Sequence, residues 1–256
     1  MDLQLKGLKA LITGGTKGIG LAIARTLAAE GADVALCARD GAAVERTVAD
    51  IGLATGGAVK VCGAPVDVSN GPALQAWTRD AAAQLGGIDI VVANVSALSI
   101  GNDPESWRKE FETDLMGTVN LVDAALPFLK ASKAASIVAI SSVSGREIDF
   151  AAGPYGVFKA ALIHYTQGLA YQLAPKGIRA NAVSPGNVYF EGGVWDHIEH
   201  NDPALFAQAL ALNPSGRMAQ PQEIANAVAF VASPAASFVS GANLVVDGAL
   251  TRGVQL

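Results

Sequence analysis

Apolar runs alternate with amphipathic or alanine-rich stretches along the whole chain. Within the runs, hydrophobic side chains occupy nearly every position, which is typical of strands buried on both faces of a parallel sheet. The predicted strands are, in chain order, Lys9–Thr13, Asp33–Cys37, Val59–Val66, Asp89–Ala93, Ser136–Ser141, Arg179–Val183 and Asn243–Val246.

The stretches between the runs have the periodicity or alanine content of helices. The expected helices are Leu21–Ala29, Ala42–Ile51, Pro72–Leu85, Glu105–Lys130, Tyr155–Ala174 and Gln222–Val231. This alternation predicts an α/β fold: a single doubly wound Rossmann-type domain, residues 1–256, with helices on both faces of a parallel sheet. The long connection Gly186–Arg217 is typical of a substrate lid, which we place at about 187–217.

The composition narrows the function classes. Half of the residues are hydrophobic, and the formal net charge is −5 without any basic stripe, so a nucleic-acid partner is excluded. Met1–Lys9 lacks the apolar run of a signal peptide, and no run approaches the ~18–20 residues of a membrane span. We therefore expect a cytoplasmic protein without a membrane partner, in which Cys37 and Cys62 are buried free thiols.

A glycine-rich turn links the first predicted strand to the first helix. Glycines permit a tight turn and a close backbone approach, so that a pyrophosphate can rest on the helix N-terminus. Glycine turns also occur in ordinary loops, but a strand before and a helix after are the context of a dinucleotide site. The predicted cofactor contacts here are Gly14, Thr16, Lys17, Gly18, Ile19 and Gly20.

The second strand indicates which dinucleotide binds. An NAD site usually has a carboxylate at the end of this strand, but here Ala38 stands there and Arg39 follows. A guanidinium suits the 2′-phosphate of NADP(H), and Lys17 adds a second cation. Asp40, one position further on, complicates the assignment, and a solvated surface pair is the alternative for Arg39 and Asp40. We predict NADP(H).

A phenol and an ammonium, Tyr155 and Lys159, lie four residues apart on an expected helix and therefore on one face. Ser142 follows a predicted strand, at the sheet edge where doubly wound folds bind ligands. Ketone reduction needs a hydride on carbon and a proton on oxygen, and a cation lowers a tyrosine pKa from near ~10. Ser142 would donate a hydrogen bond to the carbonyl oxygen. The set predicts an oxidoreductase acting on a ketone or secondary alcohol.

These motifs resemble the short-chain dehydrogenase/reductase family over essentially the whole chain, in particular its NADP-preferring, 3-oxoacyl reductase-like members. The matching segments are Thr13–Gly20, Asp67-Val68, Ser142, Tyr155, Lys159, Ser184–Gly186 and Val246–Gly248. The resemblance implies a seven-stranded parallel sheet and a homotetramer or homodimer. It also implies further cofactor contacts from Asp67, Val68, Asn94, Tyr155, Lys159, Pro185, Gly186 and Val188.

The sequence departs from the family pattern at the site itself. Val95 and Ser96 replace a usual Ala-Gly pair, Phe190 replaces a threonine, and Asp114 replaces the catalytic asparagine. We keep Asp114 among the catalytic residues because its backbone carbonyl is retained, although its carboxylate can pair with Lys159 and blunt the effect of that cation on the tyrosine. An alternative therefore stays open: a catalytically impaired NADPH-binding protein of the same fold.

Two further questions concern the lid. His197 and His200 lie near Glu191, Asp196 and Glu199, but the polar side of a lid helix explains this spacing more simply than a metal, and we expect none. The substrate is not specified by the sequence. A small ketone, an acyl thioester, a polyol and a hydroxysteroid all remain open.

Overall fold

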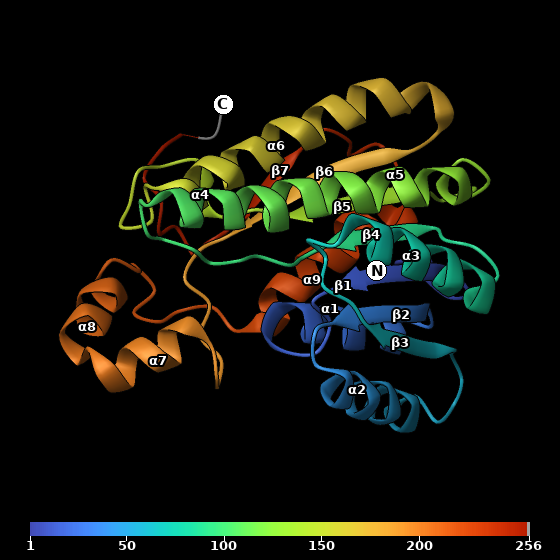
Figure 1. The fold of residues 1–256 in the computed structure, drawn as a ribbon, viewed down its shortest axis with the longest axis horizontal. Helices are drawn as coiled ribbons and strands as arrows, with labels where there is room; N and C mark the ends of the chain where they lie inside the picture. Colours follow the sequence, from blue (N-terminus) through green and yellow to red (C-terminus); the bar gives the residue numbers. More distant parts are fainter. Residues whose placement is uncertain (255–256) are drawn as a thin grey trace.

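The computed structural model describes residues 1–254. At its centre lies one seven-stranded sheet with the strand order β3-β2-β1-β4-β5-β6-β7 (Figure 1). Every neighbouring pair is parallel, as predicted. The strands are β1 (Lys9–Thr13), β2 (Asp33–Ala38), β3 (Val61–Pro65), β4 (Ile90–Ala93), β5 (Ser136–Ile140), β6 (Arg179–Pro185) and β7 (Asn243–Val246). The doubly wound fold class is confirmed.

Helices cover both faces of the sheet. They are α1 (Gly18–Ala29), α2 (Gly41–Ala54), α3 (Gly71–Leu85), α4 (Pro104–Glu110), α5 (Gly117–Leu129), α6 (Pro154–Leu173), α7 (Val194–Asn201), α8 (Pro203–Ala211) and α9 (Pro221–Ala232). One core cluster joins α1, α2 and α9 to one face, and a second joins α3, α5 and α6 to the other. None of the helices within residues 1–254 has the length and apolarity needed to cross a bilayer.

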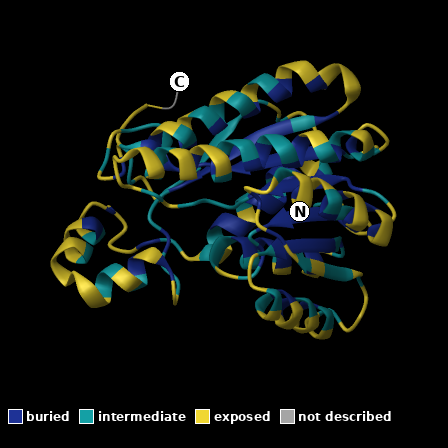
Figure 2. Ribbon diagram, in the orientation of Figure 1, coloured by how far each residue is buried: buried dark blue, intermediate teal, exposed yellow. Residues whose placement is uncertain are grey.

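Burial follows the position of each strand in the sheet (Figure 2). The central strands β4 and β5 are fully buried, whereas β3 is only partly covered because it forms an edge. The predicted third strand, Val59–Val66, was therefore too long at both ends. On the same edge strand Cys62 is half-buried rather than buried, while Cys37 is buried; both thiols are free.

The predicted single helix Glu105–Lys130 is divided by a π-helical turn, η1 (Phe111–Met116). Asp103 caps its N-terminus, accepting from the backbone N–H groups of Glu105 and Ser106. A π-turn inserts an extra residue into a helical turn and is frequent at functional sites. Here it contains Asp114, which is fully buried.

The segment predicted to be the lid, residues 187–217, is not a continuous loop, since it contains α7 and α8 (Figure 1). Trp195, Ala209 and Met218 form a small core of its own. A β-bridge between Val188 and Ala219 ties the two ends of the lid together. Its one aromatic contact with the loop after β5 joins Trp195 to Phe150, at 5.7 Å between ring centroids.

Candidate active site

The glycine turn between β1 and α1 has the geometry that the sequence predicts. Gly14 and Gly18 adopt φ values of +68° and +51°, which favour glycine. A Cβ on Gly20 would lie 2.1 Å from the carbonyl oxygen of Gly14, and one on Gly15 would lie 2.7 Å from the Cβ of Leu36. The turn therefore folds tightly over the start of α1, as a cradle for a pyrophosphate requires.

Asn94 supports this turn from beneath. Its side-chain amide donates to the carbonyl oxygens of Thr13 and Gly14 at 3.1 and 3.3 Å, and its backbone N–H donates to the Thr13 hydroxyl. Its neighbour Val95 lies 3.1 Å from the position a Gly14 Cβ would take. Asn94 thus shapes the site that we predicted it to line.

Phe190 lies against the turn. Its ring atoms would be 2.5 to 2.8 Å from a Cβ on Gly18, and the ring also packs beside Gly193. An aromatic ring thus covers Gly18 at the position where the resemblance to the family leads us to expect a threonine. Gly18, with Thr16 and Lys17, opens onto a cleft of about 1250 Å³ beneath the lid.

The end of β2 presents a cation and no free carboxylate. Arg39 is exposed just beyond Ala38, and among residues 1–254 it forms no ion pair. Asp40 caps α2 by accepting from the backbone N–H of Ala43 at 3.1 Å. The Asp67 carboxylate accepts hydrogen bonds from the hydroxyl and the backbone N–H of Ser69. These hydrogen bonds lower the pKa of Asp67, and the charge of Arg39 lowers it further. Asp40 thus has a structural use as a helix cap.

The turn after β6 lies on the other side of the crevice. Pro185 ends the strand, and a Cβ on Gly186 would meet the Asp247 backbone at 2.9 Å. Val188 is buried and packs on the core shared with α1. Pro185, Gly186 and Val188, which we predict to lie on the nicotinamide side, are therefore close together. Val68 is buried elsewhere, in contact with the position of Gly117.

The residues that we predict to transfer the proton lie beyond the end of β5. Ser142 follows that strand, and its hydroxyl is near enough to the Tyr155 phenol to affect the pKa of that phenol. Its hydroxyl also contacts the Ser144 hydroxyl at 3.3 Å. Burial raises the pKa of Tyr155 above its ordinary value; Lys159 and Ser142 oppose this shift without overcoming it. The lowered pKa that we expected is therefore absent in the protein alone.

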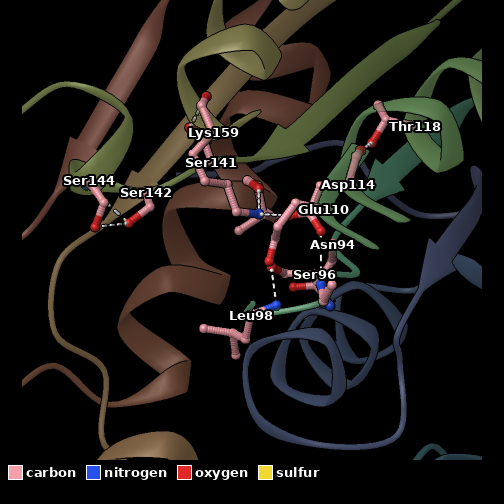
Figure 3. A network of polar contacts seen from close by, with 12 residues as sticks. Asn94, Ser96, Leu98, Glu110, Asp114, Thr118, Ser141, Ser142, Ser144 and Lys159 are labelled. Carbon is pink, nitrogen blue, oxygen red and sulfur yellow. Dashed lines mark hydrogen bonds and ion pairs between the residues drawn. The ribbon is translucent and has the colours of Figure 1, made fainter. Parts of the chain in front are cut away.

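Lys159 makes an ion pair with Asp114 (Figure 3). The Nζ-to-Oδ2 distance is 2.9 Å, and the side chains are 2% and 0% exposed. Nζ also donates to the Ile140 carbonyl oxygen at 3.1 Å and lies 5.6 Å from the centre of the Tyr155 ring. Burial disfavours the charge of Lys159, but Asp114 and Tyr155 outweigh it and hold its pKa above the usual value.

Asp114 is fixed through its side chain and its backbone. Oδ1 accepts from the Ala97 backbone N–H at 2.8 Å, and the backbone carbonyl oxygen of Asp114 accepts from the Thr118 hydroxyl at 2.7 Å. The pairing of Asp114 with Lys159 is thus as anticipated, and it uses the carboxylate that distinguishes this residue from an asparagine.

Sequence reasoning missed Glu110, a second buried carboxyl beside this pair. It is 0% exposed, Oε1 accepts from the Ser99 backbone N–H, and Oε2 has no partner among the described residues. Burial and the charge of Asp114 raise its pKa to about 8. The one sign of Glu110 in the sequence was its spacing of four residues from Asp114, which puts both side chains on one face of a helix.

The lid carboxylates gather around a tyrosine. Asp196, Glu199 and His200 lie within 4.8 Å of one another, a geometry that could hold a cation. The Tyr189 hydroxyl donates to Asp196 and Glu199 at 3.1 and 2.5 Å. These hydrogen bonds explain the proximity of the carboxylates without a metal.

Comparisons with known proteins agree with this architecture. The family model described as enoyl-(acyl carrier protein) reductase matches residues 14–251. Isoepoxydon dehydrogenase of Penicillium expansum is 41% identical over 253 residues, covering 98% of this chain and 97% of the relative.

Two solved structures share the fold closely. L-sorbose reductase from Gluconobacter frateurii, complexed with NADPH and L-sorbose, has a TM-score of 0.89 at 27% identity, covering 99% of this chain and 100% of the other. An NADPH-bound short-chain oxidoreductase from Pseudomonas aeruginosa PAO1, described as containing an atypical catalytic center, has a TM-score of 0.88 at 28% identity, covering 96% and 98%.

Proposed function

This chain belongs to the short-chain dehydrogenase/reductase family, and from that premise we propose that it transfers hydride between NADP(H) and a ketone or secondary alcohol, with Tyr155 as acid and base. The observation that carries the proposal is the convergence of Ser142, Tyr155 and Lys159 at the carboxyl edge of the sheet, beside the glycine turn.

When bound, the nicotinamide supplies or accepts the hydride. Tyr155 gives its hydroxyl proton to the carbonyl oxygen during reduction and takes a proton from the alcohol during oxidation. Ser142 donates a hydrogen bond to the same oxygen, where negative charge develops. Lys159 stabilises the tyrosinate left after proton transfer. The raised pKa of Tyr155 keeps its proton in place at neutral pH, which suits the reductive direction.

The choice of NADP(H) rests on Arg39. Its exposed guanidinium follows Ala38 at the end of β2, and Asp40 is used as a helix cap. The NADPH complexes of related structures support the same choice. Arg39→Ala should weaken NADPH binding roughly 10- to 100-fold by removing one charge-assisted contact, and leave NADH binding unchanged. Equal NADPH affinity in the variant, measured by fluorescence titration, would remove Arg39 from the site.

The first experiment compares NADPH and NADH oxidation over a carbonyl panel. The panel contains the ketones formed by oxidising isoepoxydon and a hydroxysteroid, together with L-sorbose, which is already a ketone, and a 3-oxoacyl thioester, and these span the open substrate classes. Tyr155→Phe should lower turnover on the best substrate about 10²- to 10⁴-fold, because the proton donor is lost. Tyr171→Phe is the matched control, since Tyr171 is 85% exposed on the same helix. Near-normal turnover by Tyr155→Phe would contradict the mechanism.

A second candidate function is an NADPH-binding protein with impaired catalysis. The ion pair between Lys159 and Asp114 favours it, because a neutralised lysine gives less help to a tyrosinate. Its signature is NADPH binding without turnover across the panel. Asp114→Asn should then restore turnover by freeing the charge of Lys159.

The oligomer is part of the same proposal. Exposed apolar side chains on η1 and α6, Phe111 and Val157, support burial of these helices in a homotetramer or homodimer. Sedimentation equilibrium distinguishes these states from a monomer. The cytoplasmic location stays a prediction.

A further inference from the structure

Two buried carboxyl groups, Glu110 and Asp114, lie behind Lys159 (Figure 3). Both side chains are fully buried and lie four residues apart in the chain, and Glu110 Oε2 has no partner among the described residues. The charge of Asp114 is near enough to raise the pKa of Glu110. Two neighbouring carboxylates can share a hydrogen bond only when one of them carries a proton, since the ionised group only accepts. The backbone of the loop after β4 fixes both groups, through the N–H of Ser99 to Glu110 and of Ala97 to Asp114.

The charges around Glu110 come from two elements. Asp114 faces it from the adjoining η1 turn, and Lys159 and Tyr155 face it from α6. Among the described residues, Lys159 is the one cation of this group, and Asp114 holds it directly at 2.9 Å. Two ionised carboxylates beside a single ammonium would leave an uncompensated buried charge, which is strongly unfavourable. The proton therefore stays preferentially on Glu110, whose Oε2 lacks another partner.

We propose that Glu110 is a positioning residue of the reaction, which shares a proton with Asp114 and so sets the net charge that faces Lys159 and Tyr155. The proposal rests on the proposed function, in which Tyr155 transfers the proton. With Glu110 protonated, the pair carries one negative charge that matches Lys159. When Glu110 ionises, a second negative charge faces Tyr155 and disfavours tyrosinate. Alcohol oxidation, which needs tyrosinate, is thus held back at alkaline pH.

The test is Glu110→Gln, which keeps the shape of a protonated carboxyl. Its amide can donate to Asp114 and its oxygen can accept from Ser99, but it cannot ionise. Glu112→Gln is the matched control, because Glu112 is an exposed carboxylate on η1. Circular dichroism and NADPH titration establish that each variant folds and binds the cofactor.

The first readout is thermal stability against pH, which needs no substrate. A folded-state pKa raised to about 8 means that the native protein binds a proton that the unfolded chain releases above its ordinary value of 4.5. Stability should therefore fall in the wild type as pH rises through this window, and fall less in Glu110→Gln. The Glu112→Gln curve should follow the wild type. Equal slopes in all three proteins would overturn the shared proton.

The second readout is the pH profile of kcat/KM for alcohol oxidation with NADP⁺. Without the second charge, Glu110→Gln should gain roughly 3- to 10-fold at alkaline pH over the wild type, because its tyrosinate forms at lower pH. An unchanged profile would overturn the positioning role. A changed stability slope with no turnover in any protein would instead overturn the proposed function, and the positioning role with it, while the shared proton stood.

If Glu110→Gln does not fold, the wild type alone decides the question. Infrared spectroscopy detects the C=O band of a protonated carboxyl. A band present at neutral pH and lost through about pH 8 would support the shared proton. Its absence at neutral pH would overturn it.

Discussion

The two ends of the candidate site are built by different means. At the glycine turn, close contacts of the backbone form the site, and a Cβ on Gly20 would come within 2.1 Å of a carbonyl oxygen. At the proton-transfer end, buried charges form the site, with Lys159 and Asp114 both almost wholly excluded from solvent. The first end is sensitive to added volume, and the second is sensitive to lost charge.

Because of this difference, the two ends should tolerate different kinds of substitution. The tight turn should fail when a methyl group is added at Gly20, because the atom nearest to that methyl group is a backbone carbonyl oxygen, which cannot move without opening the turn. A buried ion pair fails when one partner is removed, because the other is left uncompensated, whereas removal of both is much better tolerated. The predictions below test this distinction, beginning with the largest expected effect.

Lys159→Met should destabilise the protein by about 3–5 kcal/mol, since it leaves Asp114 buried without its cation. The double variant Lys159→Met/Asp114→Leu should recover most of that loss. Lys130→Met, at an exposed lysine that ends α5, should change stability by less than roughly 0.5 kcal/mol. Urea unfolding measures all three. A double variant no more stable than the single one would contradict the account of the proton-transfer end.

Gly20→Ala should destabilise the protein by about 1–3 kcal/mol and abolish tight NADPH binding, because the turn must open to admit the methyl group. Gly52→Ala, at a helix position with nothing within 4 Å, should stabilise by roughly 0.5–1 kcal/mol. Thermal unfolding and NADPH titration test the pair. Opposite signs for the two glycines are required; normal binding by Gly20→Ala would refute the cradle.

Asp40→Ala should cost about 1 kcal/mol of stability, the usual value of an N-cap, with no change in the preference for NADPH over NADH. Asn70→Ala removes the equivalent cap of α3, which accepts from Ala73, and should have a similar effect. A shift of cofactor preference in Asp40→Ala alone would show instead that this carboxylate contacts the ribose 2′-hydroxyl of the cofactor.

The fold followed from the sequence because central strands are buried on both faces and read as unbroken apolar runs. Val59 and Lys60 were misassigned since an edge strand gives a weaker pattern. The π-turn at Phe111–Met116 was not recognisable in the sequence, because no glycine or proline within it marks the change of helix type. Arg39 and Ser142 stood out by residue type and by their positions after strands, whereas Tyr155 and Lys159 stood out by their spacing of four on one helix.

Glu110 could not be recognised in the same way. A lone glutamate in an amphipathic helix usually faces solvent. The burial of Glu110 depends on the loop after β4, where its carboxyl accepts a hydrogen bond from the backbone N–H of Ser99. The loop's path is a property of the folded chain rather than of any local pattern. The interaction of Asp114 with Lys159 was predictable only because both positions had been assigned to one site beforehand.

The paired ends of the lid have a consequence for how such a protein changes its specificity. Tyr189 donates its backbone N–H to the Ala219 carbonyl, and Ala219 donates to that of Asn187, both at 2.8 Å. The chain between them leaves and re-enters the domain at one point and carries its own apolar centre around Trp195. Exchange of this segment for one of different length and sequence should therefore leave the sheet and its helices in place, whereas the packing of Phe190 on Gly18 would be exchanged with it.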